Sequence, residues 1–177
     1  MAKLPTKVAK RVNKSEQVST SYENLKPGKY LTKLYQVEVE EHPNYSDHVS
    51  VWLVQFNEIH SLDGTKHPGR QFLRLNVILD DSMPASYTRG QEKWDAFVRI
   101  SNGQMKAFFE NIGYTTDTDT DEMIGEPALL NIGIRTIQSG ARMGEKVNEV
   151  RGVVPADDVE DLIEEIFEDD EDDEDTF

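Results

Sequence analysis

The sequence contains no cysteine, which excludes disulfides, thiolate zinc sites and a cysteine nucleophile. It also lacks an apolar run long enough to cross a bilayer. The first residues, MAKLPTKVAKRVNK, lack the apolar middle of a secretion signal. With 177 residues, of which 37% are hydrophobic, the chain is long enough for one domain with flanking segments. We therefore expect a soluble intracellular protein with no membrane partner.

Motifs for nucleotide hydrolysis and for calcium or zinc binding are also missing. SGARMGEK has three residues between its two glycines, Gly140 and Gly144, where a phosphate-binding loop has four, and no Ser or Thr follows Lys146. DTDTDE begins like a calcium loop but has Glu122 where such a loop needs glycine, and Ala128 at its twelfth position. The histidines have no metal-ligand spacing. They are His42, His48, His60 and His67. We expect no cofactor, no metal and no enzymatic activity.

Positive charge is absent from residues 157–177, which hold 14 of the 34 acidic residues and no Lys or Arg. The rest of the chain holds the other 20 acids and all 19 bases, so most of the net charge of −15 belongs to the C-terminal segment. Residues 1–33 hold eight Lys or Arg and only two acids. Because a net charge hides such a distribution, it does not exclude nucleic acid as a partner. The pattern predicts three parts: a flexible basic arm at 1–24, a domain at 25–155 and an acidic tail at 156–177.

The hydrophobic pattern of the domain changes period in a fixed order. Three β-rich segments come first, a segment of helical period follows, and two more β-rich segments form a hairpin. The segments are 25–40, 48–59, 70–79, then 91–113, then 128–138 and 146–154. This order predicts a mainly β fold with one helix, a five-stranded OB-fold-like barrel whose helix lies between the third and fourth strands. Asn102-Gly103 favours a break in the helix, and Gly113 suits its C-cap.

The third strand, RQFLRLNVIL, alternates cleanly between two faces. Leu73 and Leu75 share one face, while Arg70, Phe72 and Arg74 share the other. An aromatic ring between two guanidinium groups suits a base stacked on the ring with phosphates on the cations. The alternative is that Phe72 belongs to a second core layer and that the arginines are surface charges.

Other aromatic and basic residues are candidates for the same surface. Because strands commonly bury aromatic residues, core packing is the favoured alternative for Trp52 and Phe56. The basic residues of the last hairpin bracket a glycine-rich loop that is placed to fold over a bound strand, although a solvated hairpin has the same pattern. Besides Arg70, Phe72 and Arg74, the predicted nucleic-acid contacts are Tyr30, Lys33, Tyr35, Trp52, Arg135, Arg142, Lys146 and Arg151.

The acidic tail has two parts. In DDVEDLIEEIFEDD the apolar residues from Val159 to Phe167 follow helical spacing, which predicts one apolar stripe for binding a partner. The following EDDEDTF is expected to be disordered because like charges repel and little can be buried. A polyanion can replace DNA in a basic groove, and a terminal phenylalanine adds nothing to solubility. The predicted partner contacts are Ile166, Phe167, Asp172, Asp173, Asp175 and Phe177.

The stretches LKPGKYLTKLYQVEVEE, GRQFLRLNVI, FFENIGYTTDTDTDEMIGEPALLNIGIR and NEVRGVVP carry a resemblance to a known family. Over residues 25–155 the chain resembles the bacteriophage single-stranded-DNA-binding (ssDNA-binding) family, which has an OB-fold core. A barrel-like body, an acidic tail and a C-terminal aromatic residue are similar to the layout of bacterial and phage ssDNA-binding proteins. The resemblance implies a tail that recruits replication and repair enzymes and competes with DNA. The basic N-terminal arm is not part of the family's pattern.

These features predict a sequence-tolerant ssDNA-binding protein that coats and protects ssDNA in phage DNA replication or recombination, in the cytoplasm of the bacterial host. Its expected partners are ssDNA and, through the tail, replication or recombination proteins. Assembly into a homo-oligomer stays open. One alternative is an acidic interaction module or DNA mimic that occupies a DNA-binding protein of the host. A metal-dependent nuclease or an annealing protein is the less favoured alternative.

Overall fold

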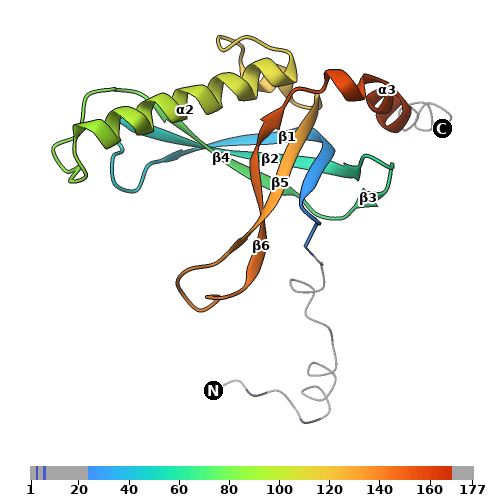
Figure 1. Ribbon diagram of the computed structural model, residues 1–177, viewed down its shortest axis with the longest axis horizontal. Coiled ribbons are helices and arrows are strands. Elements are labelled where there is room, and N and C mark those ends of the chain that lie inside the picture. Colours follow the sequence, from blue (N-terminus) through green and yellow to red (C-terminus); the bar gives the residue numbers. More distant parts are fainter. Residues whose placement is uncertain (1–2, 4–5, 7–23, 169–177) are drawn as a thin grey trace.

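The computed structural model describes Lys3, Thr6 and residues 24–168, and it shows a mainly β protein (Figure 1). Its strands form one antiparallel sheet in which β3 and β4 both pair with β2, followed by β1, β5 and β6. The strands are β1 (Gly28–Glu41), β2 (Val49–Ser61), β3 (Lys66–His67), β4 (Gln71–Ile78), β5 (Pro127–Thr136) and β6 (Lys146–Val154). The predicted mainly β class with a helix is therefore confirmed.

The sheet differs from the predicted barrel in strand number and in closure. All five predicted strands are present, and the two-residue strand β3, which was not predicted, adds a sixth. The edges of β4 and β6 lie near each other but are not hydrogen-bond partners, so the sheet is not closed. A cavity of about 210 Å³, lined in part by Leu73 and Val153, occupies the gap between these two edges.

Strand β1 joins the two parts of the sheet, with β2, β3 and β4 on one side and β5 and β6 on the other. Its first residues pair with β5, and nearly its whole length pairs with β2. The pairing with β2 shifts register twice, between Leu31 and Lys33 and between Leu34 and Gln36. Because a β-bulge bends a strand and increases its twist, these shifts allow β1 to curl and to carry β5 and β6 away from the plane of β2. Figure 1 shows the resulting hairpin of β5 and β6 projecting from the body.

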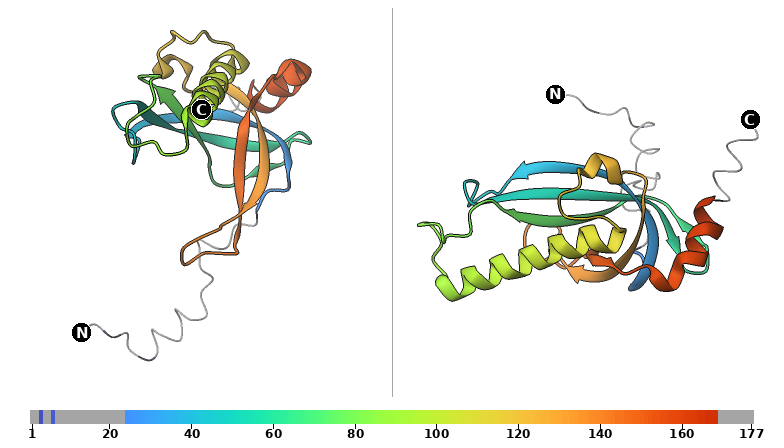
Figure 2. Two further views of the ribbon diagram at one scale, coloured as in Figure 1. Left: turned by 60° about the vertical axis from the view of Figure 1, so that its left-hand side comes forward. Right: turned by 90° about the horizontal axis from the view of Figure 1, so that it is seen from above.

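One continuous helix, α2 (Gln91–Ile112), follows β4 in the chain and packs on β4 and β6 (Figure 2). The predicted break at Asn102-Gly103 is wrong, because a glycine costs a helix only about 1 kcal/mol and the packing of the surrounding turns outweighs this. The predicted C-cap is confirmed, since Gly113 has a φ of 100° in the left-handed region. No helix in the described part of the chain is long and apolar enough to span a membrane.

The helix and the sheet enclose the hydrophobic core. Phe108 and Phe109 of α2 are buried against β-strand residues that include Phe56 and Leu130. The connection from α2 to β5 contains the short 3-10 helix η2 (Thr120–Met123), whose Met123 is fully buried in the same core. The core therefore holds the helix against β4 and β6, the two edge strands that do not pair with each other.

Aromatic rings fix the other end of α2. Trp94 is fully buried, and its indole N–H donates to the carbonyl oxygen of Asp81 at 2.7 Å. The rings of Tyr45 and Tyr87 lie edge-on to Trp94, with centroids 6.0 and 5.3 Å away. This cluster ties the loop between β1 and β2 and the loop between β4 and α2 to the start of the helix.

The segment that follows β6 folds back on the body. It forms the 3-10 helix η3 (Asp157–Val159), the short helix α3 (Glu160–Ile163) and the π-helical turn η4 (Glu164–Glu168). The prediction that this stretch is helical is confirmed. The body of the protein therefore extends past the predicted boundary at residue 155 and includes residues to 168.

Phe167 attaches this segment to the sheet. Its side chain is 4% exposed, and its ring lies edge-on to His60 of β2 with centroids 5.4 Å apart. The Nζ atom of Lys33 on β1 lies over the ring, 4.8 Å from its centroid. The prediction that Phe167 is displayed to a partner is therefore wrong for this structure, because its apolar surface is used within the chain. Asp172, Asp173, Asp175 and Phe177 lie outside the described residues.

We expect Phe167→Ala to lower the free energy of unfolding by about 2 kcal/mol. Core Phe→Ala changes usually cost about 3 to 5 kcal/mol, and we expect a smaller loss here because the short helical segment that carries Phe167 can shift to close part of the cavity. Chemical denaturation followed by tryptophan fluorescence measures the change. Glu165→Ala, at an exposed position of the same turn, is the control. Equal stability of the two variants would show that the Phe167 contact does not hold the segment.

Candidate functional site

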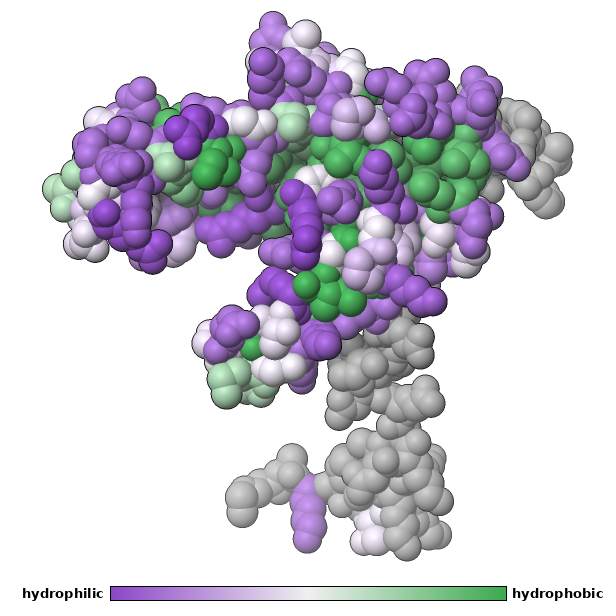
Figure 3. All heavy atoms as spheres, in the orientation of Figure 1, coloured by the Kyte–Doolittle hydropathy of each residue, from purple (hydrophilic) through white to green (hydrophobic). Residues whose placement is uncertain are grey.

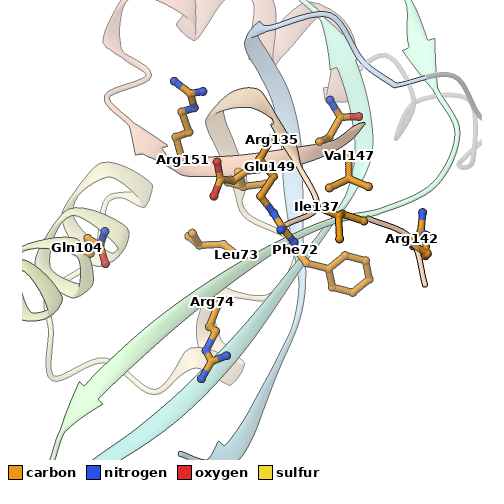
Figure 4. Close-up of a pocket in the computed structure, with 12 residues that line it drawn as sticks. Phe72, Leu73, Arg74, Gln104, Arg135, Ile137, Arg142, Val147, Glu149 and Arg151 are labelled. Atoms are coloured by element: carbon orange, nitrogen blue, oxygen red, sulfur yellow. The ribbon is translucent and has the colours of Figure 1, made fainter. Parts of the chain in front are cut away.

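A groove of about 840 Å³ lies between β4, α2 and the β5–β6 hairpin (Figure 4). Figure 3 shows hydrophilic residues over most of the surface seen in that view, with the hairpin extending below the body. The lining residues come from segments far apart in the sequence. They are Phe72, Leu73, Arg74, Gln104, Arg135, Ile137, Arg142, Val147, Asn148, Glu149, Val150 and Arg151.

Strand β4 supplies the aromatic residue of the groove. Leu73 and Leu75 are 8% and 2% exposed and belong to the core, whereas Phe72 is 50% exposed and Arg74 is exposed. The two predicted faces of this strand are confirmed, and Phe72 is not part of a second core layer. A half-exposed phenylalanine beside an arginine leaves a ring face available for stacking.

The hairpin supplies most of the positive charge. Arg135 on β5 pairs in register with Val147, and Arg151 occupies the register shift of β6. A Cβ atom on Gly133 would lie 2.3 Å from Nε of Arg151. The bare backbone of Gly133 therefore allows the Arg151 side chain to lie across β5 at the edge of the groove.

The arginines of the groove are largely unneutralised. Within residues 24–168, Arg74, Arg135 and Arg151 form no ion pair. Arg142 in the hairpin loop is paired, since its Nε donates to Glu145 at 2.7 Å. Glu149 is the one acid of the lining. Three arginines that form no ion pair within residues 24–168, against one acid in the lining, make the groove a positive site on a strongly acidic protein.

A second aromatic–arginine pair lies next to Phe72. Arg70 stacks on Tyr35, with the guanidinium carbon 4.0 Å from the ring centroid, and donates from Nη1 to Gln55 at 3.3 Å. Gln55 is the cross-strand partner of Phe72. Tyr35 sits at the second register shift of β1, where a bulge can redirect a side chain. The pair continues the surface from Phe72 toward β1 without being part of the groove lining.

The loop between β1 and β2 borders the same face at Arg74. The Nδ1 atom of His42 accepts hydrogen bonds from the backbone N–H groups of Asn44 and Tyr45, each at 3.1 Å. Burial lowers the pKa of His42, and the positive charge of Arg74 lowers it further. The neutral ring is therefore favoured in the folded protein. Its unprotonated Nδ1 atom accepts the two backbone hydrogen bonds that order the loop.

Several predicted contacts lie elsewhere. Tyr30 is 7% exposed in the core, and its hydroxyl donates to the carbonyl oxygen of Lys26 at 2.6 Å. Trp52 packs against the same core, with its ring 6.1 Å from that of Phe109. The side chain of Tyr30 is buried, which corrects its prediction as a nucleic-acid contact, and Trp52 is partly buried against the core. Lys33 lies over Phe167, and Lys146 is exposed outside the groove lining.

The groove also contains residues that were not predicted from the sequence. Val147 and Glu149 line the groove together with their neighbours in β6, because five consecutive residues at 147–151 reach it and the register shift at Arg151 interrupts the alternation of the strand. Ile137 begins the hairpin loop and Asn148 lies in β6 opposite Ile134, and no sequence pattern selected either residue. Gln104 projects from the middle of α2, and its place in the groove depends on how the helix packs.

The groove offers a ring face, guanidinium groups and the amides of Gln104 and Asn148, which suits a flexible polyanion that carries flat rings. Among the described residues, no group of three His, Asp or Glu side chains is arranged to hold a metal ion. A search of known protein families found no match to the chain, and a search of curated proteins also found none.

We expect Arg74→Gln to raise the pKa of His42 toward its ordinary value. Removing the nearby positive charge makes the imidazolium less unfavourable, and the rise is partial because burial, the larger cause, persists. An NMR titration of the imidazole protons measures the pKa, with the His42→Asn variant assigning the signal. Arg135→Gln is the control and should leave this pKa unchanged. An equal His42 pKa in the unaltered protein, Arg74→Gln and Arg135→Gln would show that the charge of Arg74 does not act on this loop.

Proposed function

We propose that this chain is a sequence-tolerant ssDNA-binding protein that coats and protects single strands. One observation carries the proposal: Phe72 lies half-exposed in a groove with four arginines. Stacking of a base on an aromatic ring contributes about 1 to 3 kcal/mol and tolerates any base, because every base has a π-face. Guanidinium groups along the same groove neutralise the phosphates between successive bases.

The strand pairings support assignment of the sheet as an OB-type barrel. Strand β1 pairs with β2 and β5, β2 pairs with β4, β5 pairs with β6, and α2 falls in the chain between β4 and β5. In this assignment β2 and β4 are the second and third barrel strands. OB-folds bind oligonucleotides on that face and with the loops after the first and fourth strands. These loops are residues 42–48 and 137–145 here, and both border the candidate surface.

Binding rather than turnover is the proposed activity. Stacking and phosphate neutralisation need no bond to break, and we assign neither a cofactor nor a catalytic residue. The proposed setting is replication or recombination of phage DNA in the cytoplasm of a bacterial host. The acidic residues at 169–175 are proposed to compete with DNA for the groove and to recruit replication or recombination proteins.

We expect Phe72→Ala to weaken binding to oligothymidine by about 5- to 150-fold, the equivalent of the 1 to 3 kcal/mol that one stacked base contributes. Fluorescence anisotropy with a labelled oligonucleotide measures the affinity. Ile100→Ala is the matched control, since Ile100 is 55% exposed on α2 and does not line the groove. If the unaltered chain does not bind the oligonucleotide, the proposed function is wrong. If Phe72→Ala and Ile100→Ala lose the same affinity, Phe72 has no stacking role.

A salt titration tests the arginines separately. Each phosphate neutralised on a single strand contributes about 0.7 to the slope of log affinity against log salt concentration. We expect Arg135→Gln and Arg151→Gln each to reduce this slope by about 0.7. Arg99→Gln, at an exposed position of α2, is the control. A slope that is equal in all variants would mean that these arginines do not contact phosphates.

A further inference from the structure

A cavity of about 210 Å³ adjoins the groove in the gap between β4 and β6, and we call it the edge cavity. The two spaces share Leu73 of β4, Gln104 of α2 and Arg151 of β6 as lining residues (Figure 4). The edge cavity has room for about seven water molecules of about 30 Å³ each. Because native interiors have few voids larger than one water molecule, this space is more than an ordinary packing defect.

Apolar side chains form much of the wall of the edge cavity. Leu73 and Leu75 are buried residues of β4, Val153 is a buried residue of β6, and Ala107 faces the cavity from α2. The side-chain amide of Asn111 on α2 donates to the carbonyl oxygen of Val153 at 2.8 Å, which fixes the helix to the open edge of β6. Because a charged group loses its hydration in an apolar space, these walls favour an uncharged ring over a phosphate.

Three exposed polar side chains also line the edge cavity, and they are Gln104, Asn131 and Arg151. Among the described residues, the side-chain amides of Gln104 and Asn131 have no hydrogen-bond partner. An amide offers both a donor and an acceptor, which is how Asn and Gln pair with the edge of a nucleobase. Arg151 lines the groove as well, so a nucleotide whose phosphate contacts Arg151 has its base within reach of the cavity.

We propose that the edge cavity is a subsite for one nucleobase of the single strand bound in the groove. The proposal rests on the proposed function and adds a second base contact to that of Phe72. The cavity is smaller than the pockets of about 300 to 1,000 Å³ that enclose drug-sized ligands, so it takes a base without its sugar and phosphate. In a duplex the base must first be unpaired and turned out of the stack, so the cavity favours a single strand.

Gly152 of β6 allows the edge cavity to be partly filled without a clash. It lines the cavity and pairs with Asn131, and residues that pair across a ladder project to the same face. A Cβ atom at Gly152 would have no heavy atom within 4 Å beyond its chain neighbours, so Gly152→Ala adds a methyl group beside Asn131. Gly103 of α2 has the same free space and lines neither the cavity nor the groove, so Gly103→Ala is the matched control.

The test measures affinity for oligothymidine of about 12 nucleotides, an OB-fold site being about 4 to 16, and for a strand of equal length whose nucleotides carry no bases. Fluorescence anisotropy at low salt gives both values for the unaltered chain and the two alanine variants. We expect Gly152→Ala to weaken oligothymidine binding at least about 5-fold, the lower end of what one stacked base contributes, and to leave binding of the base-free strand unchanged. Equal affinity of Gly152→Ala and Gly103→Ala for oligothymidine would overturn the proposal, and so would an equal loss for both strands.

NMR of the unaltered chain locates the base and does not depend on the folding of a variant. The signals followed are the backbone amide of Gly152 and the side-chain amides of Gln104 and Asn131. We expect them to shift during titration with oligothymidine and to stay unchanged with the base-free strand. No shift with oligothymidine, or the same shifts with both strands, would contradict a base in the edge cavity.

The failure of this inference is distinguishable from failure of the proposed function. If the unaltered chain binds oligothymidine and Phe72→Ala weakens that binding, the proposed function stands whatever Gly152→Ala does. If the unaltered chain does not bind, both proposals are wrong. Circular dichroism and thermal unfolding of every variant establish that a change in affinity does not come from loss of the fold.

Discussion

The pairing of β1 with both β2 and β5 is the constraint on which the rest of the structure depends. The two register shifts let this strand bend between its partners, so that β4 and β6 approach each other without forming a ladder. Helix α2 packs on these two strands and buries Phe108 and Phe109 in the core, which removes apolar area from water. The groove exists because this curvature places the outer face of β4 beside the hairpin.

The net charge of the chain does not show how charge is distributed over this surface. A protein with a formal charge of −15 presents four arginines and one acid in its groove, and its remaining acids lie largely elsewhere. Phe72 and the Arg70–Tyr35 pair add exposed rings to this positive surface. Cations alone would favour any polyanion, whereas rings favour one whose bases are unstacked and accessible, which is the distinction between single and double strands.

Phe167 divides the acidic C-terminal segment into two parts with different roles. Its contacts with His60 and Lys33 make residues 157–168 part of the folded body. The acids at 169–175 begin beyond that contact. The start of the domain is held in a comparable way, because the backbone of Leu25 is hydrogen-bonded to Asn148 at the groove. Each of the two charged segments therefore starts from a defined place on the same domain.

The sequence by itself determined five of the six strands, the presence of the helix and the faces of β4, because an alternation of period two or 3.6 is a local property of the chain. Leu73 and Leu75 inward, Phe72 and Arg74 outward, and the Gly113 cap could all be predicted. Only the tertiary structure decided that Arg135 and Arg151 join Phe72 in one groove, that Trp52 packs against Phe109, and that Phe167 is buried on His60. Burial and proximity depend on what packs across a surface from distant parts of the chain, and the periodicity of a single segment contains no information about its neighbours.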